Sequence, residues 1–555
     1  MTNYEIADSF SLLAKLMDIH GENSFKSKSY SIAAFNIEKL SVQLSELEEK
    51  KIETLNGIGV STAKKIIEIL QTKRLIQLED IILKTPPGII EMLKIKGIGP
   101  KKINIIWKEM ELETIGELLY ASKENRLKLY KGFGEKTQQT IIENIEFYLR
   151  NQGSFLYAQM IFGADQFKIY LEKTFTDKRV FITGEFARQI EVITLLEFIV
   201  EEEIEIVKNK LAEQKGLEFL EQKENYILYK TVIGIKVKIY AITENVIEQL
   251  IETSSSENFY HRILQNYKVE TVSKDEREYF TQRKLPFIPA YLREDENIIC
   301  KKLDFEAKIM PVDIKGLIHC HSNWSDGNNT VEEMALAAQK QGMEYMVISD
   351  HSKSAFYAQG LSEERIKAQQ QYVDELNIKL APFKIFKSIE SDILNDGNLD
   401  YSNAMLSTFD IVIASVHSNL KMSEEKAMAR LLTAIENPYT TILGHLTGRI
   451  LLSRPGYPLN FKKIIDACAA NSVVIELNAH PSRLDIDWRE IKYAIEKNVL
   501  ISINPDSHNT EGIEDVKYGV YVAQKAMLSK EQNLSSFSLA SFQTFIDEIK
   551  RLKRI

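Results

Sequence analysis

Short apolar runs that end in polar residues recur from about residue 314 to 525, and they constrain the fold more than any other feature. They read YMVISD, FDIVIASV, TILGH, SVVIELN and VLISINPD, and stretches with helical periodicity separate them. Such regular alternation of strands and helices favours a parallel sheet closed into an α/β barrel. Ligand sites in barrels of this kind gather at the C-terminal ends of the strands, where the polar residues of these runs stand. The sequence therefore predicts a barrel-like domain with a polar site at one end.

Histidine is distributed unevenly along the chain. Seven of the nine histidines follow residue 315, and most stand at a predicted strand end together with Asp or Glu. His319 and His321 are two residues apart on one strand, so their rings should point to the same face. A lone histidine is more often structural than a ligand. A whole ordered set of His, Asp and Glu at strand ends instead predicts a cluster of divalent cations.

The order of these residues resembles the PHP (polymerase and histidinol phosphatase) phosphoesterase domain, a distorted (β/α)₇ barrel that holds up to three metal ions. The resemblance implies hydrolysis of phosphoesters, because such ions activate water and stabilise phosphate charge. Mn²⁺ is the favoured ion, with Zn²⁺ or Fe²⁺ as alternatives for the same donor types. The implied ligands are His319, His321, Asp326, His351, Glu390, His417, His445, Asp506 and His508.

The resemblance divides these ligands among three ions. The first ion and the catalytic role fall to His319, His321, Glu390 and Asp506. Glu390 bridges to a second ion, which His417 and His445 complete, and the three remaining residues bind the third.

Other polar residues beside the ligand segments are candidates for supporting roles. Arg449, Arg454 and Arg483 are expected to hold substrate phosphate through paired hydrogen bonds, although each could equally form a surface ion pair. Asp350 is expected to orient the adjacent His351. His480 is expected not to be a ligand.

The first 145 residues have helical periodicity and carry one pattern three times. Each copy, in LNGIGVSTAKKI, IKGIGPKKINII and YKGFGEKTQQTI, is a Gly-apolar-Gly turn before a lysine-bearing helix. The glycines permit a sharp turn, and the amides that begin the helix attract phosphate. One copy alone could be a simple turn, but three resemble helix-hairpin-helix motifs, which hold the DNA backbone without reading bases. The residues expected at the backbone are Gly57, Gly59, Lys64, Gly97, Gly99, Lys101, Lys102, Gly132, Gly134 and Lys136.

Further segments resemble family X DNA polymerases. FKSKSYSIAAF, with Lys26 and Lys28, is similar to a segment of their lyase-like N-terminal domain. Residues 149–245 are similar to their palm, and LPFIPAYLREDE is similar to a proline-rich sequence that follows their thumb. With the PHP-like region, nearly the whole chain resembles the bacterial PolX family.

The palm of that family uses three carboxylates to hold two metal ions, and this chain departs from the pattern. The phosphate loop keeps Gly184 and Arg188 but has Glu185 where a serine would contact triphosphate. The three carboxylate positions fall on Leu195, Glu197 and Lys238. Leucine offers no oxygen and lysine repels a cation, so we expect DNA synthesis to be weak or lost.

Composition and length complete the expected organisation. The 555 residues carry a net charge of −9, which disfavours a protein that coats nucleic acid over its whole surface. Three isolated cysteines exclude a disulfide framework, and neither a bilayer-spanning run nor a secretion signal is visible, so we expect a cytoplasmic protein. The expected segments are a lyase-like domain (1–75), a fingers-like domain (76–148), a palm (149–245), a thumb (246–300), a linker (301–313) and a PHP domain (314–555).

The leading functional interpretation is a monomeric DNA-repair protein whose PHP domain acts as a 3′→5′ exonuclease on gapped, nicked or 3′-ended DNA without sequence specificity. Abasic-site cleavage, 3′-phosphate removal and a place in base excision repair follow from the same resemblance. The alternatives are an active PolX polymerase with an attached exonuclease, a histidinol-phosphate-type phosphatase, and a DNA-binding scaffold without catalysis. Three DNA-backbone motifs argue against the phosphatase, and the filled ligand set argues against the scaffold.

Overall fold

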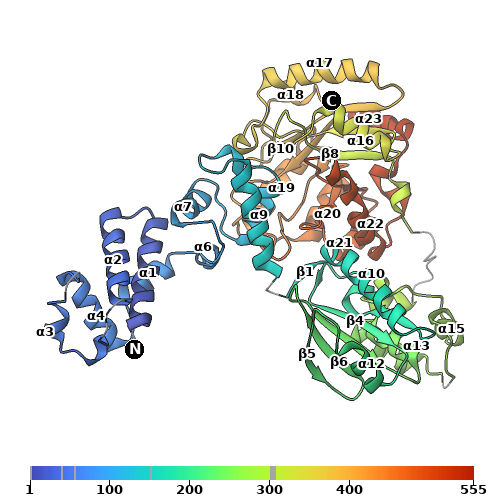
Figure 1. Ribbon diagram of the computed structural model, residues 1–555. Helices are drawn as coiled ribbons and strands as arrows, with labels where there is room; N and C mark the ends of the chain where they lie inside the picture. Colours follow the sequence, from blue (N-terminus) through green and yellow to red (C-terminus); the bar gives the residue numbers. More distant parts are fainter. Residues whose placement is uncertain are drawn as a thin grey trace. The chain divides into compact units, whose positions relative to one another are not determined.

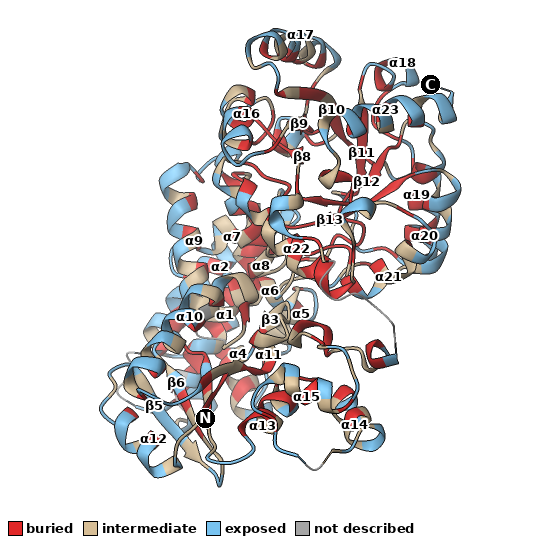
Figure 2. Cartoon of the chain, turned by 90° about the vertical axis from the view of Figure 1, so that its right-hand side faces the viewer, coloured by how far each residue is buried: buried red, intermediate tan, exposed pale blue. Residues whose placement is uncertain are grey.

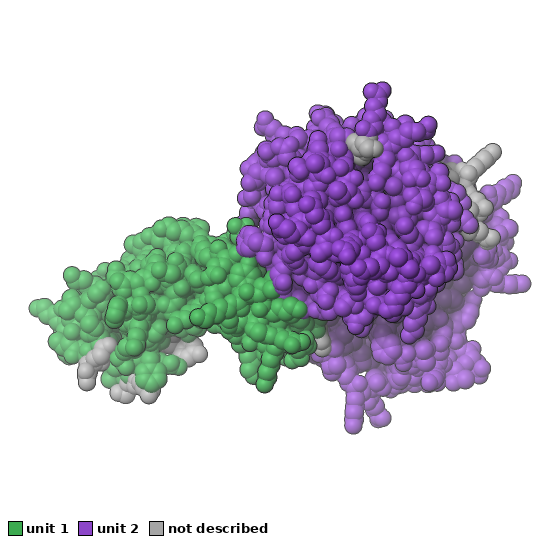
Figure 3. All heavy atoms as spheres, turned by 90° about the horizontal axis from the view of Figure 1, so that it is seen from above, with its two compact units in different colours: residues 1–123, 127–148 green, residues 124–126, 149–555 purple. Residues whose placement is uncertain are grey.

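The structure is a computed structural model that describes residues 3–38, 40, 42–55, 58–150, 153–269, 271–300 and 308–554. The chain divides into two compact units, residues 1–123 with 127–148 and residues 124–126 with 149–555, which are coloured separately in Figure 3. None of the described helices is both long and apolar enough to cross a bilayer.

The first unit is helical over its described residues, as the periodicity of the first 145 residues predicts. Apolar residues of the amphipathic helices face inward, including Phe10, Ile66 and Ile103. The helices are α1 (Asn3–Ile19), α2 (Ser24–Glu38), α3 (Glu49–Ile52), α4 (Val60–Thr72), α5 (Ile76–Leu83), α6 (Pro87–Met92), α7 (Pro100–Lys108), α8 (Ile115–Lys123) and α9 (Glu135–Arg150).

The Gly-apolar-Gly pattern has a consistent structure in this unit. The first glycines of the second and third copies, Gly97 and Gly132, have φ of +86° and +94°, a left-handed conformation that favours glycine. The second glycines, Gly59 and Gly99, stand immediately before α4 and α7 and have open space on the side where a Cβ would lie. Gly57 lies outside the described residues. The second and third turns therefore require glycine where the sequence predicts it.

The second unit begins with a region built on a five-stranded sheet of order β2-β4-β7-β6-β5. Its apolar core includes Phe198, Ile227 and Val237. The strands are β2 (Val180–Thr183), β4 (Leu195–Val200), β5 (Leu217–Gln222), β6 (Tyr226–Thr231) and β7 (Lys236–Ala241), with a separate pair β1 (Phe155–Leu156) and β3 (Val192–Ile193). The accompanying helices are α10 (Tyr157–Thr174), α11 (Gly184–Ala187), α12 (Ile204–Leu211), α13 (Val246–Thr253), α14 (Glu257–Asn266) and α15 (Glu276–Gln282).

The rest of the second unit is a seven-stranded parallel sheet of order β14-β13-β12-β11-β10-β9-β8, and it is nearly closed. A parallel bridge between Cys320 and Ser507 joins the first and last strands, and the backbone N–H of His321 donates to Ser507 O at 2.9 Å. The strands are β8 (Gly316–Cys320), β9 (Tyr345–Ile348), β10 (Lys384–Asp392), β11 (Ile411–Ser415), β12 (Ile442–Leu443), β13 (Val474–Asn478) and β14 (Ile501–Asn504). The predicted barrel is confirmed.

Helices surround this barrel, with their outer faces exposed and the strands buried (Figure 2). They are α16 (Val331–Lys340), α17 (Glu363–Lys379), α18 (Asn403–Leu406), α19 (Glu424–Glu436), α20 (Phe461–Ala470), α21 (Trp488–Glu496), α22 (Val516–Lys525) and α23 (Leu539–Lys553). All but α22 begin at a polar residue whose side chain accepts a hydrogen bond from an N–H of the first turn, which stabilises the helix start. These residues are Thr330, Ser362, Ser402, Ser423, Asn460, Asp487 and Ser538.

The barrel and the five-stranded region pack against each other within the second unit (Figure 1). The buried ammonium of Lys525 donates to the carbonyl of Arg188 at 2.5 Å, and the Lys492 Nζ lies 2.6 Å from Asp295 Oδ2. The first contact joins α22 to the phosphate loop of the palm-like region, and the second joins α21 to the segment that follows the thumb-like helices.

Candidate metal centre

Two predicted ligands occupy an unusual backbone conformation at the ends of their strands. His319 has φ of +61° at a bulge in β8, where the pairing with β9 shifts between Ile318 and Cys320. Asp506, two residues beyond β14, has φ of +54°. Left-handed backbone is uncommon outside glycine, and bulges beside active sites redirect side chains. Both side chains are thereby turned into the end of the barrel, where His319 Nε2 lies 3.4 Å from Asp506 Oδ1.

The structure brings all nine predicted ligand side chains together at this end of the barrel. The side chains of these residues are at most 4% exposed. In three overlapping groups, the candidate ligand atoms lie within 4.8 Å of one another. The groups are His321, Asp326, His351 and His508; His319, His321 and Asp506; and His351, Glu390 and His417.

Glu390, on β10, stands at the centre of these groups. Its Oε1 lies 3.3 Å from His319 Nε2, 3.1 Å from His417 Nε2 and 3.0 Å from His445 Nε2. Its other oxygen, Oε2, lies 3.0 Å from His351 Nδ1. Glu390 therefore contacts His319 of the first expected ion site and His417 and His445 of the second, as a bridging ligand would. His351 and His321 each belong to two of the groups, whereas the resemblance assigns each of them to one ion.

The site fits a cluster of divalent cations because many of its buried polar atoms make no hydrogen bond. Buried polar atoms are nearly always paired in proteins, so a concentration of unpaired ones indicates a missing partner. Imidazole nitrogens and carboxylate oxygens together suit Mn²⁺, Zn²⁺ or Fe²⁺. The unpaired atoms are His319 Nε2, His321 Nδ1, Asp326 Oδ2, both ring nitrogens of His351, Glu390 Oε2, His445 Nδ1 and His508 Nε2.

The carboxylates of the site are ionised in spite of their burial. Burial alone would raise the pKa of Glu390, but the charges of His417, His319 and His351 outweigh it and hold the pKa well below its usual value. The pKa of Asp506 is lowered in the same way, against burial, by His319 and His321. Ionised carboxylates are among the ligands that divalent cations prefer.

Two further carboxylates, which no motif indicated, contact predicted ligand histidines on the side away from Glu390. Glu476 Oε2 lies 2.6 Å from His319 Nδ1, and Asp392 Oδ1 bonds His417 Nδ1. In each case the Nε2 of the histidine faces Glu390. A carboxylate at Nδ1 fixes the ring orientation of a ligand histidine. Strand alternation could have found both, since Asp392 stands two residues after Glu390 and Glu476 two before Asn478.

Asp350 does not orient His351 as expected from their adjacency. Its carboxylate accepts hydrogen bonds from the backbone N–H and hydroxyl of Ser322 at 2.8 and 2.7 Å, and from Gln369 at 2.6 Å. A further bond from Ser325 Oγ, at 2.5 Å, ties it to the loop that carries Asp326. Its role is to shape this loop, because its lone pairs are directed there.

The three candidate arginines differ in their surroundings. Arg449 donates to Asp487 at 2.7 Å and to the carbonyls of Arg483 and Leu484. Arg454 donates to the carbonyl of Gly448 at 3.0 and 2.8 Å. Burial lowers the pKa of His445, and the charge of Arg483 lowers it further. Phosphate binding by the three stays a prediction.

The palm positions lie together on β4, β7 and α11, and their charged groups are bonded to one another. Glu197 stands opposite Lys238 in the strand pairing, with Oε1 3.6 Å from the Lys238 Nζ and 3.0 Å from the Tyr240 hydroxyl, which donates to it. Glu185 accepts from the N–H of Thr194 at 2.7 Å and from that of Leu195 at 3.2 Å. Burial raises the pKa of Glu197 more than Lys238 and Tyr240 lower it.

Two further palm residues are held in place by close contacts. Arg188 Nε donates to Glu294 at 2.5 Å and its Nη1 to the carbonyl of Thr253 at 2.9 Å. Gly184, with φ of +67°, packs so closely on Glu197 that a Cβ would lie 1.9 Å from Glu197 Oε2. The Glu197 side chain therefore occupies the space beside the phosphate loop.

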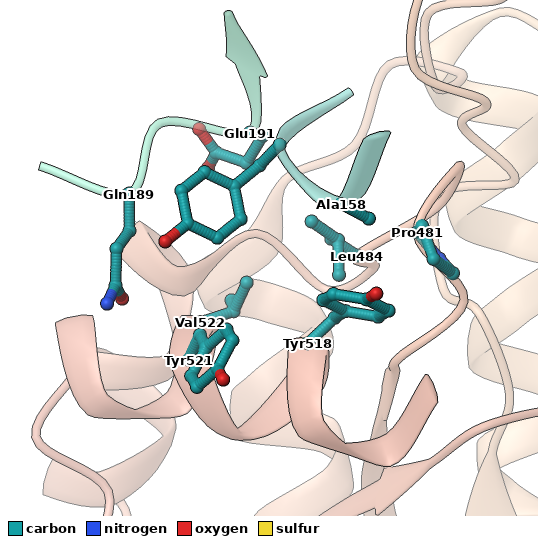
Figure 4. A pocket seen from close by; sticks show the side chains of 9 residues that line it. Ala158, Gln189, Glu191, Pro481, Leu484, Tyr518, Tyr521 and Val522 are labelled. Atoms are coloured by element: carbon teal, nitrogen blue, oxygen red, sulfur yellow. The ribbon is translucent and has the colours of Figure 1, made fainter. Parts of the chain in front are cut away.

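A separate pocket lies between the palm-like region and the barrel (Figure 4). It has about 330 Å³ of empty space, part of it open to solvent. Tyr518, Tyr521 and Leu484 line its barrel side, and Gln189 and Glu191 its palm side. None of its lining residues is a predicted ligand, so it is distinct from the metal centre.

Comparison with known proteins agrees with this arrangement. Residues 1–75 match a helix-hairpin-helix domain, residues 89–146 a SAM-like helix-hairpin-helix tandem, and residues 318–480 the PHP domain. The chain is 31% identical to the DNA polymerase/3′-5′ exonuclease PolX of Bacillus subtilis (strain 168), over 96% of this chain and 97% of the relative. The chain belongs to the PolX family.

Other relatives match a smaller part of this PolX-family chain. A probable phosphatase of Thermoanaerobacter sp. (strain X514) is 25% identical over 40% of the chain and 90% of the relative. A probable phosphatase of Acetivibrio thermocellus is 30% identical over 27% of the chain and 59% of the relative. The family and the fold expected from the sequence are confirmed.

Proposed function

We propose that the barrel of this PolX-family chain hydrolyses DNA phosphodiesters from the 3′ end with a cluster of divalent cations, favoured as Mn²⁺. The observation that carries the proposal is the convergence of nine buried His, Asp and Glu side chains with unpaired nitrogens and oxygens at one end of the barrel. The name of the Bacillus subtilis relative, which includes 3′-5′ exonuclease activity, supports the same reaction. When bound, such ions supply electrophilic stabilisation of phosphate and activation of water.

The residues of the chain have separate tasks in this reaction. His319, His321, Glu390 and Asp506 would hold the ions that act on the phosphate, and the five other predicted ligands would complete the cluster. Glu476 and Asp392 orient the rings of His319 and His417, so that the Nε2 of each faces Glu390. Arg483, whose charge lowers the pKa of His445, is the favoured candidate among the arginines for binding substrate phosphate.

The helix-hairpin-helix turns bind the DNA backbone without reading sequence. Lys64, Lys101 and Lys136 are exposed beside the turns, where each adds a charge to the helix-start amides. The substrates are DNA with a free 3′ end, including gapped and nicked duplexes. We assign the protein to base excision repair, as a monomer in the cytoplasm, with the segment boundaries given by the sequence analysis.

We further propose that the palm no longer supports DNA synthesis. Leu195 lacks an oxygen, and Glu197 is engaged by Lys238 and Tyr240, so the three-carboxylate site that would hold two metal ions is missing. The probable-phosphatase relatives favour phosphomonoester hydrolysis as a second candidate activity, which on DNA would be removal of a 3′-phosphate.

One gel tests these proposals together. A 5′-labelled primer on a longer template is incubated with metal-stripped protein and Mn²⁺, with and without the four dNTPs. We expect primers shortened from the 3′ end in both reactions. Lengthening only with dNTPs would contradict the loss of synthesis, and no shortening in either would contradict the exonuclease. A primer with a 3′-phosphate, in a parallel lane, tests the phosphatase activity.

A further inference from the structure

His508 repeats the arrangement seen at His319 and His417, but its carboxylate comes from far away in the chain. The Nδ1 of His508 lies 2.6 Å from Glu124 Oε2, while its Nε2 faces Asp326 Oδ1 at 3.4 Å. The side chains of His508 and Glu124 are 4% and 5% exposed. For His319 and His417 the partners are strand residues of the barrel itself, Glu476 and Asp392. Glu124 instead precedes the barrel by almost two hundred residues and belongs to none of the predicted sites.

The residues that follow Glu124 also contact the barrel close to His508. Residues 124–126 belong to the second unit, although the residues on both sides of them belong to the first. Asn125, with φ of +59°, donates from Nδ2 to Asn328 Oδ1 at 2.6 Å, and the N–H of Asn328 donates to the carbonyl of His508 at 2.7 Å. The guanidinium of Arg126 lies 4.7 Å from the centre of the Tyr357 ring. Three consecutive side chains therefore contact the barrel around the group formed by His321, Asp326, His351 and His508.

The proton of His508 must lie on Nδ1 for this arrangement to bind a cation. Two acceptors stand at Nδ1, the Glu124 carboxylate at 2.6 Å and the carbonyl of Asp506 at 3.0 Å. The Nε2 has no hydrogen-bond partner and faces the Asp326 carboxylate. A carboxylate at the far nitrogen of a ligand histidine orients the ring and increases its basicity.

We propose that Glu124 is a positioning residue for His508, and that through it residues 124–126 complete the site of one cation of the cluster. This inference rests on the proposed function, because it requires that the cluster binds metal. Glu124 lies inside the match to the helix-hairpin-helix tandem, residues 89–146.

The test is the number and affinity of bound Mn²⁺ ions in Glu124→Ala and Glu124→Gln, measured on the full chain by elemental analysis after dialysis and by calorimetric titration. We expect one ion to bind about 10- to 100-fold more weakly in Glu124→Ala, with the others unchanged. Glu124→Gln keeps an acceptor without its charge and should lie between Glu124→Ala and the wild type. His508→Ala marks which ion is affected, since it should weaken the same one.

Glu109→Gln is the matched control, because Glu109 is an exposed glutamate at the end of α7. It should bind all ions as the wild type does. Wild-type affinity for every ion in both Glu124 variants would overturn the inference while leaving the proposed function intact. Equal weakening of all the ions would also overturn it, because the role would then be general to the fold. A wild-type protein that binds no Mn²⁺ would overturn the proposed function, and this inference with it.

Discussion

The metal centre of the barrel and the palm cluster are both groups of buried charged residues, yet they satisfy their charges in opposite ways. In the barrel, several nitrogens and oxygens at the centre, among them His319 Nε2 and Glu390 Oε2, have no hydrogen-bond partner. In the palm, Glu197 pairs with Lys238 and Tyr240, and Arg188 with Glu294. An unpaired buried polar atom is costly, so it persists only where a ligand repays that cost. Buried nitrogens and oxygens without hydrogen-bond partners therefore distinguish a site suited to metal ions from one whose charged side chains pair with each other.

The largest expected effect comes from removing the central carboxylate of the barrel. Glu390→Gln should slow release of 3′ nucleotides at least about a thousandfold, because it takes a charged bridging ligand from the cluster. DNA affinity should stay unchanged, since the helix-hairpin-helix turns lie in the first unit. A 5′-labelled duplex resolved on a denaturing gel gives the rate, and fluorescence anisotropy gives the affinity. Wild-type cleavage by this variant would remove the contrast with the palm.

Charge reversal at the turns separates binding from cutting. The combined variant K64E/K101E/K136E should bind a gapped duplex roughly 10- to 100-fold more weakly near 0.1 M salt and lower the salt dependence of log K by about 0.9 for each DNA phosphate that is no longer neutralised. Its Mn²⁺ binding should match the wild type. Anisotropy titrations at several salt concentrations measure the effect, and an unchanged salt slope would show that these lysines do not bind DNA.

Lys525 tests how the palm-like region is attached to the barrel, through its bond to the carbonyl of Arg188. Burial lowers the pKa of Lys525 to about 8. Because the pKa of Lys525 in the folded protein lies below its unfolded value, protonation of Lys525 favours the unfolded state. The free energy of unfolding is therefore highest above a pH of about 10.5 and decreases as the pH falls toward 8.

The difference across that range is on the order of 3 kcal/mol. The thermal midpoint of the wild type should therefore rise relative to that of Lys525→Met between pH 8 and 10.5. Differential scanning calorimetry of both proteins measures the relative shift. Parallel pH profiles of the two midpoints would show that Lys525 is not buried as a charged group.

The smallest expected effect is on the palm itself. Leu195→Asp alone should produce no detectable primer extension, because Lys238 still occupies the third carboxylate position and Glu197 remains paired with it. Extension assays with Mn²⁺ and the four dNTPs measure this, using the wild type as the reference. Extension by the single variant would mean that the palm differs from an active site by one residue, and the comparison between the two clusters would fail.

Features that depend on interactions between neighbouring residues could be predicted from the sequence, and features that depend on contacts between distant residues could not. The Gly-apolar-Gly turns depend on local backbone geometry, so Gly97 and Gly132 could be recognised from their neighbours alone. The convergence of the nine predicted ligands could be anticipated because the barrel repeats one strand-and-helix unit and places every strand end on the same face. The sharing of His351 and His321 between groups depends on distances across the barrel, which a motif does not encode.

The sequence by itself determined the family and the barrel, and it predicted which histidines and carboxylates converge, because periodicity and residue type are local properties of the chain. Only the tertiary structure decided that Asp350 fixes a loop instead of orienting His351, and that Glu124 reaches His508. In the first case, Asp350 is next to His351 in the sequence, but it accepts its hydrogen bonds from Ser322 and Gln369, which the fold brings close to it. In the second, almost four hundred residues separate the partners, and only folding brings them within 2.6 Å.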